Sequence, residues 1–519
     1  MNALHIDGNS LSLADVREVV YDFRPVLLGA DARGAVSRAR AVVDDQVANN
    51  RVAYAITTGV GKLADVRIPP EQIRELQLNL IRSHCAGVGE PLAEPEVRAM
   101  MLLRANSLSK GYSGVRPLVI DTLCEMLNRR VHPVVPARGS VGASGDLAPL
   151  AHLVLPMLGE GQVLIADRSG KYSGAHLAAA DALREAGIKP LVLEAKEAVS
   201  LINGTQGMLS VGALALLAAE ALVDSADVIG ALSLDALRGT DAAFDVRIHQ
   251  VRPHPGQLRT AENLRRLLEG SQIRESHRDC ARVQDAYSLR CMPQVHGAVR
   301  DTLAHCRRVM ETEINSAVDN PLVFAPVRRP GEKHAEEAIL SGGNFHGEPV
   351  AFALDFLGIA LSSLAGISER RLERLVNPAL NEGLPPFLAP GAGLNSGFMM
   401  AQVTAAALAS ENKVLAHPAS VDSITTSGNK EDYVSMGMAA SLKLRQIVAN
   451  ARNVLAIEAM AAAQAVDFLA PLKTSKRLQA AHIAIRSVSP PIEHDRVLAD
   501  DFARISDLIG SGKLADALR

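Results

Sequence analysis

The chain has 519 residues, 48% of them hydrophobic and 21% charged, a composition that excludes disordered and collagen-like proteins. Lys and Arg total 54 against 57 Asp and Glu, a net charge of −3, so the broad basic field that binds nucleic acid is absent and nucleic acid is not an expected partner. The five irregularly spaced cysteines indicate neither a disulfide framework nor a zinc site and favour a reducing compartment: Cys85, Cys124, Cys280, Cys291 and Cys306.

The amino-terminal segment lacks the basic start and the continuous apolar core of a secretion signal, which predicts a cytoplasmic location. The most apolar stretches, 211–219 and 349–367, are short or are interrupted by Asp355 and serines. Crossing about 30 Å of hydrocarbon needs a longer uninterrupted run, so no membrane span is expected.

Helix is the expected secondary structure, because Ala, Leu and Val are abundant and alternation of β-branched residues is rare. The chain should open with a strand at 4–6, followed by a helix that Ser12 and Asp15 begin with a capping box. Helical runs at 71–85 and 96–110 then alternate with loops rich in Gly and Pro. This part of the chain is expected to carry the chemistry.

Four long runs without proline predict long buried helices at 209–237, 296–317, 350–376 and 436–469. The predicted fold class is therefore mainly α, a long central helix bundle with a loop-rich N-terminal region. Three consecutive regions are expected, with a C-terminal helical appendage as the last: 1–196, 197–470 and 471–519.

Small residues are concentrated between Arg138 and His152, immediately before a run compatible with helix. The glycine spacing there is not that of a dinucleotide-binding loop, and Thr58 to Lys62 lacks the upstream glycine and the hydroxyl residue of a P-loop. Neither segment predicts nucleotide binding.

The tripeptide Ala143-Ser144-Gly145 permits a different chemistry. If the Gly145 nitrogen attacks the Ala143 carbonyl carbon, cyclisation and loss of two waters give an electrophilic ring whose exocyclic methylene comes from Ser144. Glycine matters because it has no Cβ to block the approach. An isolated Ala-Ser-Gly is common, so the surrounding sequence has to decide.

The whole segment Gly-Ser-Val-Gly-Ala-Ser-Gly-Asp-Leu-Ala-Pro-Leu-Ala-His resembles the signature of the ammonia-lyases and aminomutases that carry a methylidene-imidazolone group. The resemblance extends over nearly the whole chain, through ordered blocks at 54–63, 79–92, 138–152, 201–206, 283–300, 319–322, 342–349 and 429–437. It implies a 4-methylidene-imidazol-5-one formed from Ala143, Ser144 and Gly145, with no diffusible cofactor and no metal.

The resemblance also assigns roles near the electrophile. Tyr54 matches the base that removes the substrate's β-proton, on a loop that Gly59 and Gly61 would allow to close. Asn203 matches the residue that bonds to the prosthetic ring and the substrate. The alternatives are a structural tyrosine, ordinary turn glycines and an asparagine that caps a helix.

A second block carries the residues matched to binding of the substrate's polar groups. Arg290 would grip the α-carboxylate with its planar guanidinium, while Tyr287 and Gln284 would lie beside the amino group and the ring. Asn320 and Phe345 match further pocket positions, although Phe345 also suits core packing.

Two positions bear on the substrate. Ser83-His84 resembles the dipeptide of histidine-type enzymes, and Glu431 lies where those enzymes carry a glutamate. Together they can bind both nitrogens of an imidazole, whereas an apolar ligand would leave a buried glutamate unpaired. Singly, His84 suits a helix core and Glu431 a helix N-terminus. Four residues depart from the histidine-type pattern: Thr57, Val60, Lys430 and Tyr433.

The implied activity is elimination of ammonia from L-histidine to give trans-urocanate, within a homotetramer whose subunits share active sites. The alternatives are a tyrosine or phenylalanine ammonia-lyase, a 2,3-aminomutase of the same family, or a helical scaffold that has lost its chemistry.

Overall fold

The structure is a computed structural model of the whole chain and describes residues 1–165, 176–279, 282–325 and 338–519. The chain divides into two compact units. The first comprises Met1–Leu214, Arg308–Leu354 and Ala419–Leu442, and the second comprises Ala215–Arg307, Asp355–Pro418 and Lys443–Arg519. Each unit therefore combines segments that are far apart in the sequence.

This division differs from the three consecutive regions that the sequence predicts. The chain passes from one unit to the other inside its long helices, where composition gives no sign of a boundary. The residues expected to form a C-terminal appendage, 471–519, belong to the second unit. The four helices that pass between the units are α9 (Gln206–Ala236), α14 (Met292–Glu313), α15 (Glu348–Val376) and α17 (Gly437–Asp467).

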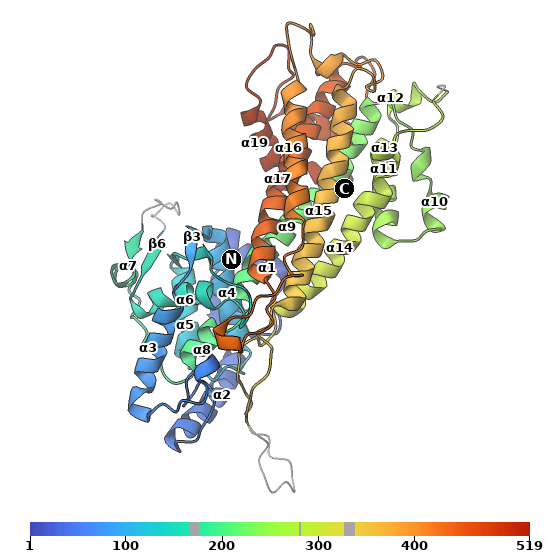
Figure 1. Cartoon of the computed structure of the whole chain (residues 1–519). Helices are drawn as coiled ribbons and strands as arrows, with labels where there is room; N and C mark the ends of the chain where they lie inside the picture. Colours follow the sequence, from blue (N-terminus) through green and yellow to red (C-terminus); the bar gives the residue numbers. More distant parts are fainter. Residues whose placement is uncertain (166–175, 280–281, 326–337) are drawn as a thin grey trace. The chain divides into compact units, whose positions relative to one another are not determined.

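The first unit packs short helices around small sheets (Figure 1). Its own helices are α1 (Leu13–Tyr21), α2 (Ala30–Ala48), α3 (Ile73–His84), α4 (Glu94–Ser109), α5 (Pro117–Asn128), α6 (Leu147–Val154), α7 (Ala179–Ala186) and α8 (Glu197–Ile202). Short 3₁₀ helices occupy Gly61–Leu63, Pro70–Gln72, Leu155–Leu158 and Ser427–Asn429.

The strands of the first unit are two to four residues long. Parallel β1 (Leu4–Ile6) and β2 (Val26–Leu28) pair with Leu4 opposite Val26. The other pairs are antiparallel: β3 (Val88–Pro91) with β5 (Pro136–Arg138), β4 (Val131–Pro133) with β6 (Gln162–Ile165), β6 with β7 (Leu177–Ala178), and β8 (Leu322–Val323) with β9 (Ile339–Leu340). The strand β5 leads directly into the loop that carries Ser144.

The capping box predicted for the first helix is confirmed. The Ser12 Oγ accepts from the Asp15 amide at 3.1 Å, and an Asp15 carboxylate oxygen accepts from the Ser12 amide at 3.0 Å. These two bonds satisfy amide groups that have no partner within the helix.

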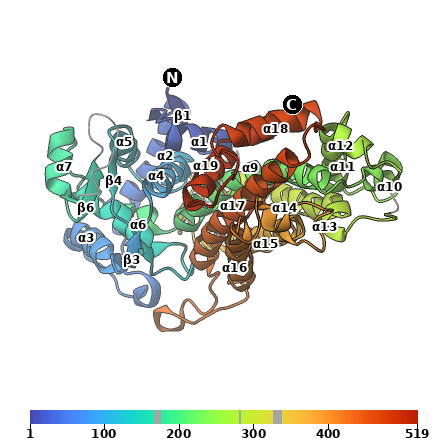
Figure 2. The ribbon, with the colours of Figure 1, turned by 90° about the horizontal axis from the view of Figure 1, so that it is seen from above.

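In the second unit, α9, α14, α15, α16 (Met399–Leu415) and α17 lie side by side (Figures 1 and 2). The Glu458 carboxylate of α17 is fully buried and accepts from the Ser233 hydroxyl of α9 at 2.7 Å. The Arg371 guanidinium of α15 donates to both oxygens of the same carboxylate, at 2.6 and 2.9 Å. A desolvated carboxylate needs such partners, so this cluster fixes the register of three helices.

Shorter helices complete the second unit: α10 (Val246–Gln250), α11 (Pro255–Leu268), α12 (Gln272–Glu275), α13 (Tyr287–Arg290), α18 (Lys476–Arg486) and α19 (Ala499–Gly510), with 3₁₀ helices at Ala242–Phe244, Pro386–Leu388 and Lys513–Leu518. The mainly α prediction is confirmed, and so are the four long helices within a few residues of each expected end.

In the described part of the chain two helices, α9 and α15, are long and apolar enough to cross a membrane by length and composition alone. The sequence stretches considered too short for this are therefore parts of longer helices. In their most apolar windows, 72% of the α9 residues and 56% of the α15 residues are buried inside the structure, as expected for helices that form a protein core.

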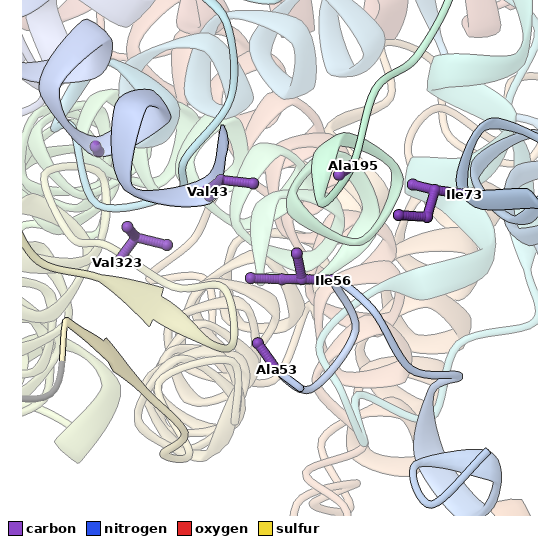
Figure 3. Packing of buried hydrophobic residues seen from close by; sticks show 7 residues of the cluster. Val43, Ala53, Ile56, Ile73, Ala195 and Val323 are labelled. Carbon is purple, nitrogen blue, oxygen red and sulfur yellow. The ribbon is translucent and has the colours of Figure 1, made fainter. Parts of the chain in front are cut away.

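A hydrophobic cluster anchors the loop that carries Tyr54. Ala53 and Ile56, on either side of that tyrosine, are buried against Val43 of α2, Ile73 of α3 and Val323 of β8 (Figure 3). Ala39 and Ala195 complete the cluster. The loop is thus tied to the core at both sides of Tyr54.

Candidate active site

The Ala143-Ser144-Gly145 tripeptide lies in a loop between β5 and α6 that other segments hold from several sides. The Met436 amide donates to the Val141 carbonyl at 2.9 Å, and the Asn203 Nδ2 donates to the Ser144 carbonyl at 2.8 Å. The backbone of residue 145 forms a bridge to that of Gly204. Segments distant in sequence therefore fix the bend of the tripeptide.

Asp146 connects this loop to the N-terminus of α9. Its carboxylate, which is fully buried, accepts from the Ser140 hydroxyl at 2.8 Å and from the Met208 amide at 2.7 Å. Burial raises the pKa of Asp146 to about 6, while the bonds from Met208 and Ser140 oppose that rise. At neutral pH the carboxylate can thus accept from the free amides of the helix.

Gly145 adopts a φ of +73°, a conformation that residues with a Cβ rarely adopt. A Cβ placed there would collide with the carbonyl group of Gly204 and would lie 2.7 Å from the Gly204 nitrogen. The Gly204 oxygen is also the acceptor for the Asp146 amide at 2.7 Å. The close approach of two backbone segments therefore requires glycine at position 145.

A cavity of about 620 Å³ in the first unit opens onto the tripeptide. Nine of the thirteen residues predicted for the site line it: Tyr54, Gly61, His84, Ala143, Ser144, Asn203, Asn320, Phe345 and Glu431. Gly145, which follows Ser144 directly, does not line the cavity and packs against the backbone of Gly204. The structure thus brings together residues from seven separate stretches of the sequence.

Tyr54 lies in the cavity at the start of its loop. Its hydroxyl oxygen accepts a hydrogen bond from the Gly61 amide at 3.0 Å. Because the phenol oxygen is the acceptor in this bond, its own proton remains available for exchange with a bound molecule. The phenol oxygen is thus held by the backbone of its own loop and faces the cavity.

His84 is the last residue of α3 and is half-buried at the cavity wall. Its Nδ1 lies 2.8 Å from the Leu80 carbonyl oxygen, which can only accept, so the proton is assigned to Nδ1 and Nε2 is left as an acceptor. Burial lowers the pKa of His84, and the Leu80 carbonyl and the Glu431 carboxylate oppose this shift. The ring is therefore neutral at physiological pH.

Glu431 follows the 3₁₀ helix Ser427–Asn429 and precedes α17, so it does not occupy a helix N-terminus. One carboxylate oxygen, Oε1, accepts from the Ser144 hydroxyl at 2.7 Å. The other, Oε2, accepts from the hydroxyls of Thr426 at 2.7 Å and Ser427 at 2.9 Å. A glutamate is thus placed directly beside the serine expected to become electrophilic.

Asn203 ends α8, so it is both a helix cap and a cavity residue. The fully buried Arg104 donates to its backbone carbonyl at 2.9 Å and to the Gln206 side chain at 2.8 Å. Burial lowers the pKa of Arg104 to about 10, opposed by the charge of Asp319. The buried Arg104 guanidinium therefore holds the backbone of Asn203, a residue of the cavity wall, through a hydrogen bond.

Three predicted site residues, Gln284, Tyr287 and Arg290, belong to the second unit. Tyr287 begins the short helix α13 and is 71% exposed, and the Arg290 guanidinium lies over its ring, 4.6 Å from the centroid. The cavity of the first unit is lined by residues of that unit alone among the described part of the chain.

Sequence reasoning missed Arg104, Asp146, Thr426 and Ser427 as members of this site. Arg104 shares the helical run 96–110 with Glu96, Arg98 and Lys110, so its charge alone did not distinguish it. The position of Asp146 directly after Gly145 was a usable signal. The two hydroxyls lie on a partly exposed turn without any distinctive pattern.

Comparison with known proteins matches residues 11–487 to the family model described as aromatic amino acid lyase. The chain belongs to this family. A protein of Koribacter versatilis named histidine ammonia-lyase is 71% identical over 524 residues, covering 100% of both chains. The crystal structure of histidine ammonia-lyase from Trypanosoma cruzi is 43% identical with a TM-score of 0.89, covering 100% of this chain and 95% of that one.

The tyrosine aminomutase of Streptomyces globisporus is 38% identical to this aromatic amino acid lyase, with a TM-score of 0.90 over 99% of this chain and 98% of that one. Lyases and mutases therefore share this fold, and the fold alone does not select between them.

Three of the four residues that depart from the histidine-type pattern line the cavity of this lyase: Val60, Lys430 and Tyr433. The fourth, Thr57, is buried, and its hydroxyl accepts from the Ala53 amide at 2.9 Å. That substitution therefore bears on the shape of the Tyr54 loop, while the other three bear on the cavity surface.

Proposed function

We propose that this aromatic amino acid lyase is a histidine ammonia-lyase, which eliminates ammonia from L-histidine to give trans-urocanate. One observation carries the proposal: the Glu431 carboxylate lies 2.7 Å from the Ser144 hydroxyl, in a cavity that His84 also lines. Polar groups for an imidazole thus stand beside the reactive tripeptide. The names of the relatives at 71% and 43% identity support the same substrate.

The residues around the tripeptide fit a methylidene-imidazolone formed from Ala143, Ser144 and Gly145. Gly145 has the bend and the absence of Cβ that cyclisation requires, and the Asn203 Nδ2 bonds to the Ser144 carbonyl. The Asn203 Oδ1 is buried and has no partner among the described residues, so it can accept a further donor. When formed, the group supplies an electrophile that makes the amino nitrogen of the substrate a better leaving group.

Residues of this chain perform the remaining steps. Tyr54 removes the β-proton, and the Gly61 amide holds its hydroxyl oxygen in place while that proton moves. Asn203 orients the reacting end of the substrate, and Asn320 and Phe345 shape the wall around it. Glu431 and His84 receive the imidazole, which fixes the distance from the β-carbon to the base.

We place Gln284, Tyr287 and Arg290 in the site of a neighbouring subunit of a homotetramer. The family resemblance implies shared sites, and these residues belong to the second unit. Arg290 would bind the α-carboxylate through two parallel N–H groups, with Tyr287 stacked on its guanidinium. A cytoplasmic location belongs to the same proposal.

The competing functions are a tyrosine or phenylalanine ammonia-lyase, a 2,3-aminomutase, and a scaffold without activity. Ammonia release and product identity should be measured with L-histidine, L-tyrosine and L-phenylalanine. We expect ammonia and trans-urocanate from histidine only. A β-amino acid product would instead identify a mutase.

Three variants extend the test. Glu431→Gln should lower kcat/KM for histidine by about 10- to 100-fold, as expected for loss of a hydrogen bond to a charge. Asp432→Asn removes a neighbouring carboxylate and should have a smaller effect. Ser144→Ala should fold, have the mass calculated for its own sequence without any dehydration, and release no ammonia. Unchanged histidine turnover in Glu431→Gln would contradict the substrate assignment, and full activity in Ser144→Ala would contradict the electrophile.

A further inference from the structure

Two hydroxyl groups hold one edge of the Glu431 carboxylate. Thr426 and Ser427, called here the hydroxyl pair, both donate to Oε2, at 2.7 and 2.9 Å. A carboxylate oxygen that already accepts two short hydrogen bonds has little capacity for a third partner. The hydroxyl pair therefore occupies the hydrogen-bond acceptor capacity of Oε2, so Oε1 is the carboxylate oxygen that can accept a hydrogen bond from a ligand.

The backbone places the hydroxyl pair and Glu431 at the two ends of one tight turn. The Thr426 amide donates to the Glu431 carbonyl at 2.9 Å, and these two residues form an isolated antiparallel bridge. The 3₁₀ helix Ser427–Asn429 closes the turn between them. The hydroxyl pair is thus brought to the Glu431 carboxylate by local backbone structure, whereas the donor to Oε1, Ser144, comes from the distant reactive loop.

Within the described ranges, three groups donate to this carboxylate and all are neutral hydroxyls: Ser144, Thr426 and Ser427. Among the described residues no ion pair involves Glu431. Hydroxyls orient a carboxylate without cancelling its charge, whereas a lysine or arginine would do both. The negative charge consequently remains available to an N–H donor in the cavity.

The two oxygens differ in what happens to their donors. In the proposed maturation Ser144 loses its hydroxyl as water, so Oε1 loses the donor it has in the unmodified chain. Thr426 and Ser427 keep theirs. The finished site would then have one edge of Glu431 saturated and the other edge open towards the substrate.

We infer that Thr426 and Ser427 are positioning residues that aim Oε1 of Glu431 at the imidazole of the substrate. This inference rests on the proposed function, because it names the groups that make Glu431 selective. It concerns recognition of the ring and not formation of the electrophile.

The test measures ligand binding as well as turnover. Calorimetry on the full-length protein should compare trans-urocanate with trans-cinnamate, which has a phenyl ring in place of the imidazole. Thr426→Val and Ser427→Ala should each weaken urocanate binding by about tenfold, the effect of one hydrogen bond to a charge, and leave cinnamate binding unchanged. Thr426→Ser should restore urocanate binding because it restores the hydroxyl.

Thr425→Val is the matched control. Thr425 is exposed, is the adjacent residue in the chain and is not a donor to Glu431, so the same substitution there should change neither affinity. The mass of the tripeptide-containing peptide should show loss of two waters in every variant. This measurement separates an effect on recognition from an effect on maturation.

The outcomes distinguish the two proposals. If the parent protein prefers urocanate and the hydroxyl-pair variants bind it as tightly as the parent does, the inference is wrong and the proposed function stands. Equal weakening of both ligands would indicate a general structural role and would also overturn the inference. A parent protein with no preference for urocanate would overturn the proposed function itself.

Discussion

Replacing Gly145 by alanine tests the geometry on which the site depends. The added Cβ would lie 2.7 Å from the Gly204 nitrogen and closer still to its carbonyl group, so the backbone of one segment must move. That movement would strain or break the bond from the Asp146 amide to the Gly204 oxygen, now 2.7 Å long. A positive φ at a residue with a Cβ costs about 1–2 kcal/mol, and a buried hydrogen bond left unmade costs about 1–3 kcal/mol.

Gly145→Ala should therefore lower the free energy of unfolding by about 2–5 kcal/mol. Gly270 supplies the control, because it has a similar φ of +78° and no described residue lies within 4 Å of the position of a Cβ. Gly270→Ala should show only the conformational cost of about 1–2 kcal/mol. The difference between the two variants isolates the collision with Gly204.

Urea unfolding gives the free energies, and mass spectrometry of the peptide that contains residue 145 reports dehydration. We expect Gly145→Ala to retain both waters and to lack ammonia release, while Gly270→Ala loses both waters as the parent does. A Gly145→Ala protein that is fully dehydrated and no less stable than Gly270→Ala would refute the claim that this contact requires glycine.

Three further results are expected. The pKa of Asp146 is raised from 3.8 to about 6 in the folded state, so the protonated carboxyl stabilises the fold at a pH below 3.8 and this stabilisation is lost as the pH rises through about 6. Urea unfolding of the parent and of Asp146→Asn across this pH range should show that the parent loses about 3 kcal/mol relative to the variant. Arg371→Met leaves the buried Glu458 carboxylate without its cation and should lower the free energy of unfolding by about 3–5 kcal/mol in the same assay. The double variant Arg371→Met with Glu458→Leu has no buried charge at this position and should regain much of the lost free energy of unfolding. Burial raises the pKa of the Cys124 and Cys306 thiols to about 12, so iodoacetamide should label neither at neutral pH until the chain unfolds, and rapid labelling of the folded protein would contradict their burial.

The helices and the reactive tripeptide were predictable because each depends on residues adjacent in the sequence. Long runs without proline predict long helices, and Ala143, Ser144 and Gly145 are contiguous within a distinctive motif. The bond from Arg104 to the Asn203 carbonyl joins residues 99 positions apart. No local pattern records such a pairing, so sequence reasoning from one chain does not find it.

The division into units was missed for a different physical reason. Domain boundaries are usually visible where a polar linker leaves one core and enters another. Here α9 passes from the first unit at Leu214 to the second at Ala215 inside a continuous helix. Helical periodicity and apolar composition continue through that point, so the sequence carries no mark of the change.

The segment 419–442 acts on the site in two ways that depend on different residues. Ser435 and Met436 hold the reactive loop through the carbonyls of Gly142 and Val141, at 3.2 and 2.9 Å. Glu431, five residues from Met436, instead faces the cavity and contacts Ser144. The bonds that bend the tripeptide are made to its backbone, whereas the contact from Glu431 is made to a hydroxyl that the proposed maturation removes. A change at the turn that holds Glu431 would therefore leave the backbone restraints on the tripeptide in place. The fold itself is shared by proteins named histidine ammonia-lyase and tyrosine aminomutase.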